Sequence, residues 1–211
     1  MNAHYFRSPN KKGKIAVLLS GRGSNFVAIH DAVQGGKINA EIALVFSNKK
    51  EAPGIQIANE KNLETASLNP KDFPDREEYD KEVVKELKNR DIDLVCLAGY
   101  MRILTPYFCK SFENKIMNIH PALLPSFPGL HVQKKAIEWG VRFSGATVHF
   151  VVPEVDMGPI ILQAVVPVLQ DDTEDSLSER ILKEEHKIYP EAVRLYFEGR
   201  LELRENRVFI L

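Results

Sequence analysis

Short apolar runs alternate with segments of helical periodicity over the first 120 residues, and this order constrains the fold more than any other feature of the chain. Runs with the character of buried β-strands occupy residues 14–20, 42–46, 65–68, 93–98 and 116–120. Helical patterns fill the intervening residues 26–33, 53–61 and 75–90. Because strands that alternate with helices are typical of βαβ units, we predict a mostly parallel, Rossmann-like sheet with helices on both faces.

The second half of the chain has a different pattern. A proline-rich loop is followed by an expected helix at 131–139 and two apolar strands at 146–152 and 159–168. A long helix at 175–197 and a short hairpin near residues 205–206 complete the pattern. We therefore predict one α/β domain at residues 14–211, with a C-terminal β-α portion, after a flexible extension at residues 1–13.

Charge and cysteine content narrow the class of protein. The 211 residues carry a net charge of −1, so no basic excess favours nucleic acid or a membrane surface as partner. No apolar run is long enough to cross a membrane, and the N-terminus lacks the apolar core of a signal peptide. The two cysteines, Cys96 and Cys109, match neither a disulfide framework nor a metal motif. We expect a cytoplasmic protein with reduced thiols.

The segment from Asn118 to Pro121 carries the strongest chemical signal. On an extended backbone, Asn118 and His120 project to the same side while Ile119 points away, and Pro121 disfavours a helical His120. An amide can hold a developing oxyanion, and an imidazole can handle protons. Asp156 follows in a loop between two strands, where a carboxylate close to His120 would stabilise its imidazolium form. A plainer interpretation is that these are polar residues at a strand end and an ordinary hairpin-turn aspartate.

Three further features suit ligand binding. The turn at 21–25 lies between an apolar strand and a helix, where backbone N–H groups favour phosphate, although Ser24 could instead be a helix N-cap. Residues 101–104 could line a slot for a flat apolar ligand or pack in the core. Glu185 falls on the apolar face of the long helix, so its carboxylate needs a ligand or an internal arginine. His149 has the pattern of a structural strand residue, and no residue spacing matches a metal site.

Four motifs occur in order along the chain: Gly21-Arg22-Gly23-Ser24-Asn25, Ala98-Gly99-Tyr100-Met101-Arg102-Ile103-Leu104, Asn118-Ile119-His120-Pro121-Ala122-Leu123-Leu124-Pro125 and Val155-Asp156-Met157-Gly158-Pro159. Together they closely resemble the formyltransferase family that uses 10-formyltetrahydrofolate. The resemblance extends from about residue 14 to residue 203. It departs from the family at Met157, where a second glycine is common, and in the unmatched first dozen residues.

The resemblance implies a role for each motif. Asn118, His120 and Asp156 would form the catalytic trio. The residues expected to bind a phosphoribosylglycinamide substrate are Gly23, Ser24, Asn25, Leu182, Lys183, Glu184 and Glu185. The residues expected to contact the folate are Arg76, Met101, Arg102, Ile103, Leu104, Asn118, Val152, Pro153, Glu154, Val155 and Asp156.

The implied reaction is transfer of a formyl group from 10-formyltetrahydrofolate, as co-substrate, to the glycinamide amine, without a metal. The expected partners are these small molecules, and the expected state is a monomer or weak homodimer. A hydrolase that removes formyl from the folate would use the same trio, with water as acceptor. The chain could also be a non-catalytic folate- or phosphate-binding module. A nicotinamide-dependent oxidoreductase fits less well, because Phe26 breaks the dinucleotide fingerprint.

Overall fold

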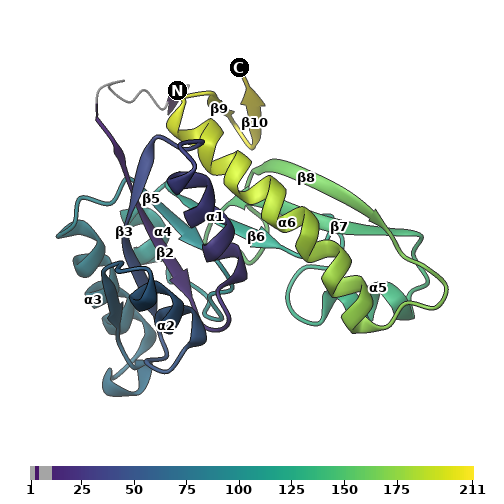
Figure 1. The fold of residues 1–211 in the computed structure, drawn as a ribbon, viewed down its shortest axis with the longest axis horizontal. Helices are drawn as coiled ribbons and strands as arrows, with labels where there is room; N and C mark the ends of the chain where they lie inside the picture. The colour runs from purple at the N-terminus through teal and green to yellow at the C-terminus, as the bar shows by residue number, and fades with distance from the viewer. Residues whose placement is uncertain (1–2, 5–10) are drawn as a thin grey trace.

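The computed structural model describes residues 3–4 and 11–211, and it is built around a seven-stranded sheet of order β4-β3-β2-β5-β6-β7-β8 (Figure 1). The parallel part contains β2 (Gly13–Leu19), β3 (Ala40–Ser47), β4 (Thr65–Ser67), β5 (Leu94–Leu97) and β6 (Ile116–His120). The antiparallel part contains β7 (Phe143–Phe150) and β8 (Ile160–Pro167). The predicted single α/β domain with a mostly parallel sheet is therefore confirmed.

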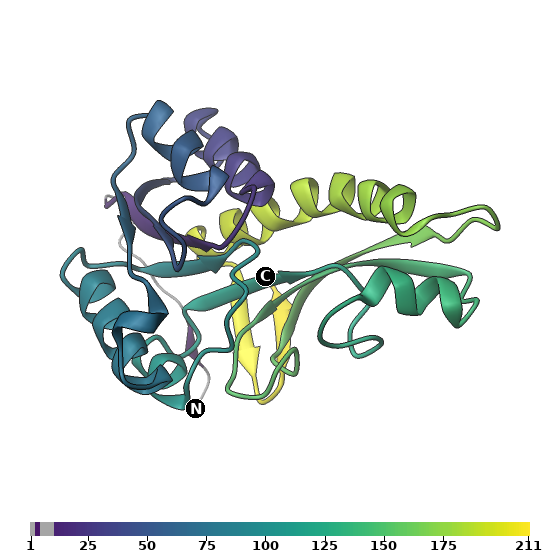
Figure 2. The same ribbon diagram turned by 90° about the horizontal axis from the view of Figure 1, so that it is seen from below.

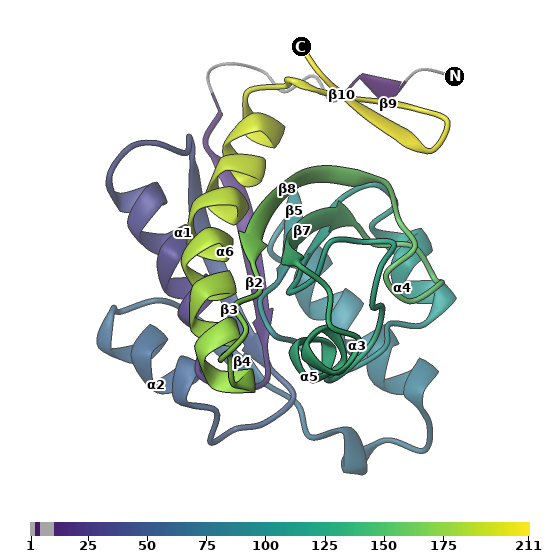
Figure 3. The ribbon, with the colours of Figure 1, turned by 90° about the vertical axis from the view of Figure 1, so that its right-hand side faces the viewer.

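Helices cover both faces of this sheet. α1 (Ser24–Gln34) and α6 (Glu174–Phe197) lie side by side on one face (Figure 3), with α2 (Pro53–Glu60) and α5 (Val132–Glu138) packed into the same core. α3 (Arg76–Lys88) and α4 (Pro106–Ser111) cover the other face of the parallel part (Figure 2). Within the described part of the chain, no helix is long and apolar enough to span a membrane.

Local sequence signals explain the clearest helices. The Asp75 side chain accepts hydrogen bonds from the Glu77 and Glu78 backbone N–H groups and caps α3. The predicted apolar face of α3 is confirmed, because Tyr79, Val83, Val84 and Leu87 are all buried. A capping box between Thr173 and Ser176 begins α6.

The chain ends form a small second sheet. β9 (Leu201–Arg204) and β10 (Arg207–Ile210) make the predicted hairpin, and β1 (Ala3–His4) pairs with β9. Most of the extension at residues 1–13 lies outside the described residues, so its flexibility stays a prediction.

Two elements differ from those expected from the sequence. The helix expected at 26–33 begins at Ser24, and Gly23 is its N-cap, without a side-chain cap, so the interpretation of Ser24 as an N-cap is wrong. The strand expected at 146–152 covers Phe143–Phe150 instead, because its pairing with β8 extends through Ser144 and Gly145, which carry no apolar signal. Three short elements were not predicted: β1, α4 and the 3-10 turn Pro70–Asp72.

Candidate active site

The candidate site lies at the carboxyl ends of the parallel strands. Because β2, β5 and β6 are parallel, the segments that follow them leave from the same edge of the sheet. A cavity of about 500 Å³ opens at this edge. Its walls come from residues 99–104, from the end of β6 and the start of α5, and from residues 151–156 in the β7–β8 loop. Segments far apart in the sequence therefore meet around one space.

His120 and Asp156 form a pair that lines this cavity, with side chains only 6% and 9% exposed. Nδ1 of His120 lies 3.4 Å from Oδ2 of Asp156. Nε2 of His120 donates to the Phe127 carbonyl at 2.9 Å, because a carbonyl oxygen can only accept. The Gly129 N–H donates to Asp156 at 2.8 Å and fixes the carboxylate. Both ring nitrogens of His120 thus face acceptors, an arrangement that suits a doubly protonated imidazolium.

Asn118 is oriented by a histidine whose part in the site the sequence did not reveal. Nδ1 of His149 donates to the Phe150 carbonyl at 2.8 Å, so the lone pair of Nε2 accepts from Asn118 Nδ2 at 3.2 Å. Burial lowers the pKa of His149, which keeps the ring neutral and able to accept. The Asn118 amide therefore has one N–H directed to His149 and a second N–H available to a ligand.

The antiparallel register places His149 directly opposite Asn118, with Asp156 Oδ1 3.8 Å from its ring. The strand alternation of His149 was visible in the sequence. Its partner was not, because that depends on which strand lies next to β7. The interpretation of His149 as a structural residue was therefore incomplete, since the residue also belongs to the cluster around Asn118 and Asp156.

The loop at residues 101–104 presents apolar side chains to the cavity. Met101 is 63% exposed and Ile103 is 55% exposed, so the prediction of core packing fails for these two residues and holds for Leu104. Arg76 does not line the cavity; its guanidinium donates to the Ile103 carbonyl at 3.1 Å and supports the loop from α3. The predicted contributors Val152, Pro153, Glu154 and Val155 line the facing wall.

The glycine-rich turn after β2 is closely packed. Gly23 has a left-handed backbone (φ 76°), and a Cβ there would lie 3.0 Å from the Gly54 Cα. The Gly21 carbonyl accepts from the Gly54 N–H at 3.0 Å, which joins the turn to the start of α2. The turn therefore holds the first N–H groups of α1 in place.

Glu185 meets this turn through Asn25. Nδ2 of Asn25 donates to Glu185 Oε2 at 2.7 Å, and both residues are buried. Burial raises the pKa of Glu185, while the hydrogen bond from Asn25 opposes that rise. The internal partner of this carboxylate is an amide, so the expected internal arginine is wrong. Oδ1 of Asn25 is buried and has no hydrogen-bond partner among residues 11–211.

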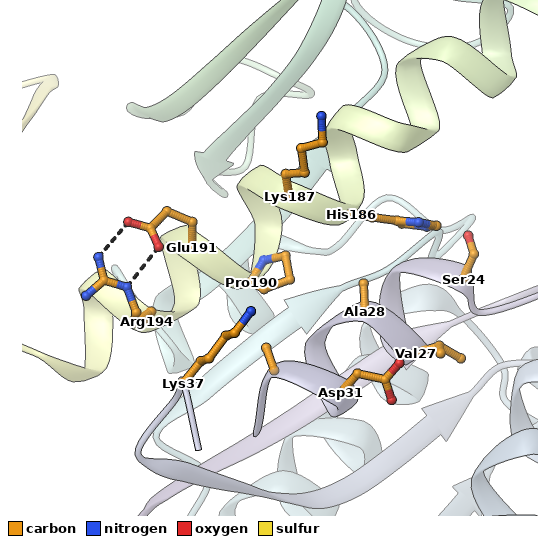
Figure 4. A pocket seen from close by; sticks show the side chains of 11 residues that line it. Ser24, Val27, Ala28, Asp31, Lys37, His186, Lys187, Pro190, Glu191 and Arg194 are labelled. Carbon is orange, nitrogen blue, oxygen red and sulfur yellow. Dashed lines mark hydrogen bonds and ion pairs between the residues drawn. The ribbon is translucent and has the colours of Figure 1, made fainter. Parts of the chain in front are cut away.

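A groove of about 600 Å³ continues from Ser24 along the joint between α1 and α6. Figure 4 shows the side chains of Ser24 and His186 at one end of this groove and the Glu191–Arg194 ion pair toward the other. Burial lowers the pKa of His186, and its Nε2 has no hydrogen-bond partner within the described ranges. No sequence pattern had singled out this histidine.

The residues predicted on α6 do not all converge on the site. Leu182, Lys183 and Glu184 line neither the cavity nor the groove, and Glu184 pairs with Lys187 at 2.7 Å. Their contact with a ligand stays a prediction. Within the described part of the chain, no group of three or more histidine, cysteine or acidic residues could hold a metal ion.

Comparisons with known proteins agree on one family. A family model described as formyl transferase matches residues 13–193. The phosphoribosylglycinamide formyltransferase of Escherichia coli is 44% identical over 93% of this chain and 92% of its own length. The trifunctional purine biosynthetic protein adenosine-3 of Drosophila melanogaster is 47% identical over 90% of this chain, which spans 14% of that longer protein. The crystal structure of glycinamide ribonucleotide transformylase 1 from Symbiobacterium toebii matches with a TM-score of 0.93 and 48% identity, covering 95% of this chain and 94% of that one.

Proposed function

This chain belongs to the formyl transferase family, and from that premise we propose that it transfers the formyl group of 10-formyltetrahydrofolate to the amine of phosphoribosylglycinamide. The products are the N-formylglycinamide ribonucleotide and tetrahydrofolate, in a step of purine synthesis. The observation that carries this proposal is the buried His120–Asp156 pair beside Asn118. The pair lines an apolar cavity at the edge of the sheet from which the glycine-rich turn also leaves.

The trio suits the formation of a tetrahedral intermediate. The glycinamide nitrogen attacks the formyl carbon, and the carbonyl oxygen becomes an oxyanion. The second N–H of Asn118 donates to that oxygen. A protonated His120, whose two N–H groups are directed to the Phe127 carbonyl and to Asp156, stabilises the oxyanion through its positive charge. Both groups are held by bonds formed before the ligand arrives, so little reorganisation accompanies the reaction.

Collapse of the intermediate breaks the bond from the formyl carbon to N10 of the folate. The attacking amine must lose a proton, and N10 must gain one. Asp156, fixed by the Gly129 N–H and adjacent to His120, can move that proton directly or through a water. Each bond made or broken is then matched by a proton transfer, and the proposed reaction needs no metal.

The glycine-rich turn suits the ribonucleotide. The N-terminus of α1 directs backbone N–H groups and the Ser24 hydroxyl toward a phosphate. Asn25 and Glu185 provide a buried amide and carboxylate that suit the hydroxyl and amine donors of the ribose and glycinamide. The unpartnered Oδ1 of Asn25 supports this role, since a ligand donor would satisfy it.

The apolar cavity suits the folate. Met101 to Leu104 form one wall and Val152 to Asp156 the other, so a flat ring system fits between them. Arg102 also lines this cavity, and its guanidinium stacks on the Tyr79 ring, 4.4 Å from the ring centroid. Arg76 supports the loop and does not face the cavity, so we assign it an indirect role.

We further propose that the protein acts in the cytoplasm as a monomer or weak homodimer. Burial raises the pKa of Cys96 to about 12 and that of Cys109 to about 11, so both thiols stay protonated at neutral pH. Inert thiols fit a reducing compartment. Sedimentation across a range of protein concentrations measures the oligomeric state.

An absorbance assay with 10-formyltetrahydrofolate, with and without phosphoribosylglycinamide, tests the function. We expect folate product only when the ribonucleotide is present. Equal product without it would make water the acceptor and establish the hydrolase alternative. Product in neither reaction, with folate binding intact, would favour a non-catalytic binding module.

A further inference from the structure

Ser20 joins the base of the glycine-rich turn to the loop at residues 99–104. It directly follows β2, is buried, and immediately precedes the glycine-rich turn. Its backbone N–H donates to the Gly99 carbonyl at 3.0 Å. Its hydroxyl accepts from the Met101 N–H at 2.8 Å and donates to Asn48 Oδ1. The hydroxyl is thus bonded on both sides.

These bonds join segments with separate proposed tasks. The residues after Ser20 form the turn suited to the ribonucleotide, and Met101 begins the wall suited to the folate. β2 and β5 are adjacent parallel strands, so the two loops leave the sheet next to each other. The hydrogen bond from Met101 to Ser20 therefore connects the loop proposed to bind the folate with the start of the turn proposed to bind the ribonucleotide.

Other hydrogen bonds of the loop at residues 99–105 connect it to α3, on the other side from Ser20. The Ile103 carbonyl accepts from Arg76, and the Thr105 N–H donates to Asp80, both on α3. These bonds hold the far end of the loop against the other face of the sheet. The Ser20 hydroxyl anchors the near end, toward the glycine-rich turn.

We propose that Ser20 is a positioning residue that sets the separation of the two loops, and hence the distance from the formyl carbon to the attacking amine. The inference rests on the proposed function. Rates of transfer between two bound substrates depend steeply on this distance, and a misplacement of about 1 Å can cost about a hundredfold. Removal of the hydroxyl leaves the Met101 N–H and Asn48 Oδ1 without their shared partner.

The test separates transfer from binding. Ser20→Ala should lower the single-turnover rate of formyl transfer by about tenfold or more. The dissociation constants of tetrahydrofolate alone and of phosphoribosylglycinamide alone, measured by calorimetry, should change by less than about threefold, the size of one weak hydrogen bond. Ser20→Thr restores a hydroxyl and should recover most of the rate.

A second buried serine provides the control. The Ser47 hydroxyl accepts from the Lys49 N–H, a local bond within the turn that follows β3, so Ser47→Ala should keep the wild-type rate. If Ser20→Ala does not fold, Asn48→Ala carries the test, because it removes one partner of the Ser20 hydroxyl and should give a smaller loss of rate with unchanged binding.

Two results would overturn the proposal. One is a wild-type rate of transfer in the folded Ser20 or Asn48 variant. The other is a loss of rate that Ser20→Thr does not recover and that is matched by equal weakening of both dissociation constants, which indicates general destabilisation. A wild-type protein without ribonucleotide-dependent turnover would instead refute the proposed function, so the two failures are distinguishable.

Discussion

On the side of the glycine-rich turn, polar groups are buried and bonded to one another, whereas on the side of residues 101–104 apolar side chains are exposed. Asn25 is 8% exposed and Glu185 is 7% exposed, and a hydrogen bond joins them. Met101, Ile103 and Leu130 are more than half exposed at the cavity on the other side. One region has its polar contacts in place before a ligand binds, and the other has apolar surface that a ligand would cover.

The difference follows from the chemistry of the two proposed ligands. A charged ribonucleotide must exchange many water contacts for equivalent protein contacts, and fixed donors lower the cost of that exchange. A flat, largely apolar ring system gains mainly from the removal of apolar area from water, which requires less exact geometry. Substitutions on the two sides should therefore have effects of different size and kind.

The largest effect is expected between the two regions, at His120. His120→Ala should lower turnover by about 10²- to 10⁴-fold, the range of general acid–base contributions, and should leave the dissociation constants of both ligands nearly unchanged. Steady-state kinetics with calorimetry measures both. His30 offers a matched control, because it is buried and pairs with Asp31 at 3.0 Å outside the site, so His30→Ala should keep its turnover. If His120→Ala keeps the turnover of the wild-type protein, His120 has no part in the mechanism.

The next effect tests the rigidity of the glycine-rich turn. Gly23→Ala should lower the free energy of unfolding by about 1–3 kcal/mol, because the left-handed backbone and the contact with Gly54 both resist a Cβ. The variant should bind the ribonucleotide more weakly and tetrahydrofolate as before. Chemical denaturation and calorimetry measure these changes.

Gly36 provides a control that distinguishes backbone strain at a left-handed glycine from the close packing around Gly23. Its φ is 69°, close to that of Gly23, but a Cβ there meets nothing within 4 Å. Gly36→Ala should therefore cost about 1 kcal/mol and change no ligand affinity. If the two variants lose equal stability, the close packing of the turn against α2 contributes nothing.

The succession of strands and helices along the chain was predicted well, because it depends on local patterns. Apolar runs and helical periodicity identified β2, β3, β5, β6, α3 and α6 within a few residues. The six-residue helix α4 was missed, since a helix of fewer than two turns shows little periodicity, although Thr105 before Pro106 is a recognisable start signal.

The site was less predictable where it depends on partners distant in the chain. Glu185 stood out as a charge on an apolar face, but Asn25, its partner, is 160 residues away in sequence. His149 has a meaning for the site only once β6 and β7 are known to be antiparallel neighbours. The residue types were visible, whereas their pairing was a property of the fold.

Glu185→Gln tests how the buried charge of Glu185 affects the free energy of unfolding, because it replaces the carboxylate with a neutral amide of similar shape. Burial raises the pKa of Glu185 in the folded protein above its value of 4.5 in the unfolded chain. Protonated Glu185 therefore adds to the free energy of unfolding. This contribution is complete below pH 4.5 and is lost as the pH rises through the folded-state pKa. Glutamine does not titrate, so Glu185→Gln should raise the free energy of unfolding by about 1 kcal/mol at pH 7. The increase should become smaller as the pH falls toward the pKa of glutamate in the unfolded chain.

The same substitution should weaken ribonucleotide binding by about tenfold, since a charged acceptor is replaced by a neutral one. Denaturation at several pH values and calorimetry at pH 7 measure the two effects. Glu184→Gln is the control for stability, because Glu184 is only half-buried and pairs with Lys187. A pH-independent gain in stability for the Glu185 variant would contradict the argument from burial.

The smallest effect is expected on the folate side. Leu130 lies at the cavity and is 65% exposed, so a bound ligand rather than the protein would bury most of its side chain. Leu130→Ala should weaken tetrahydrofolate binding by about fivefold, from the loss of about 1 kcal/mol of apolar burial, and should change the free energy of unfolding by less than about 0.5 kcal/mol. Leu169 is a similarly exposed leucine outside the cavity, and Leu169→Ala should change neither quantity. A Leu130 variant that loses stability but binds the folate normally would reverse the comparison, because that side chain would then serve the fold and not the ligand.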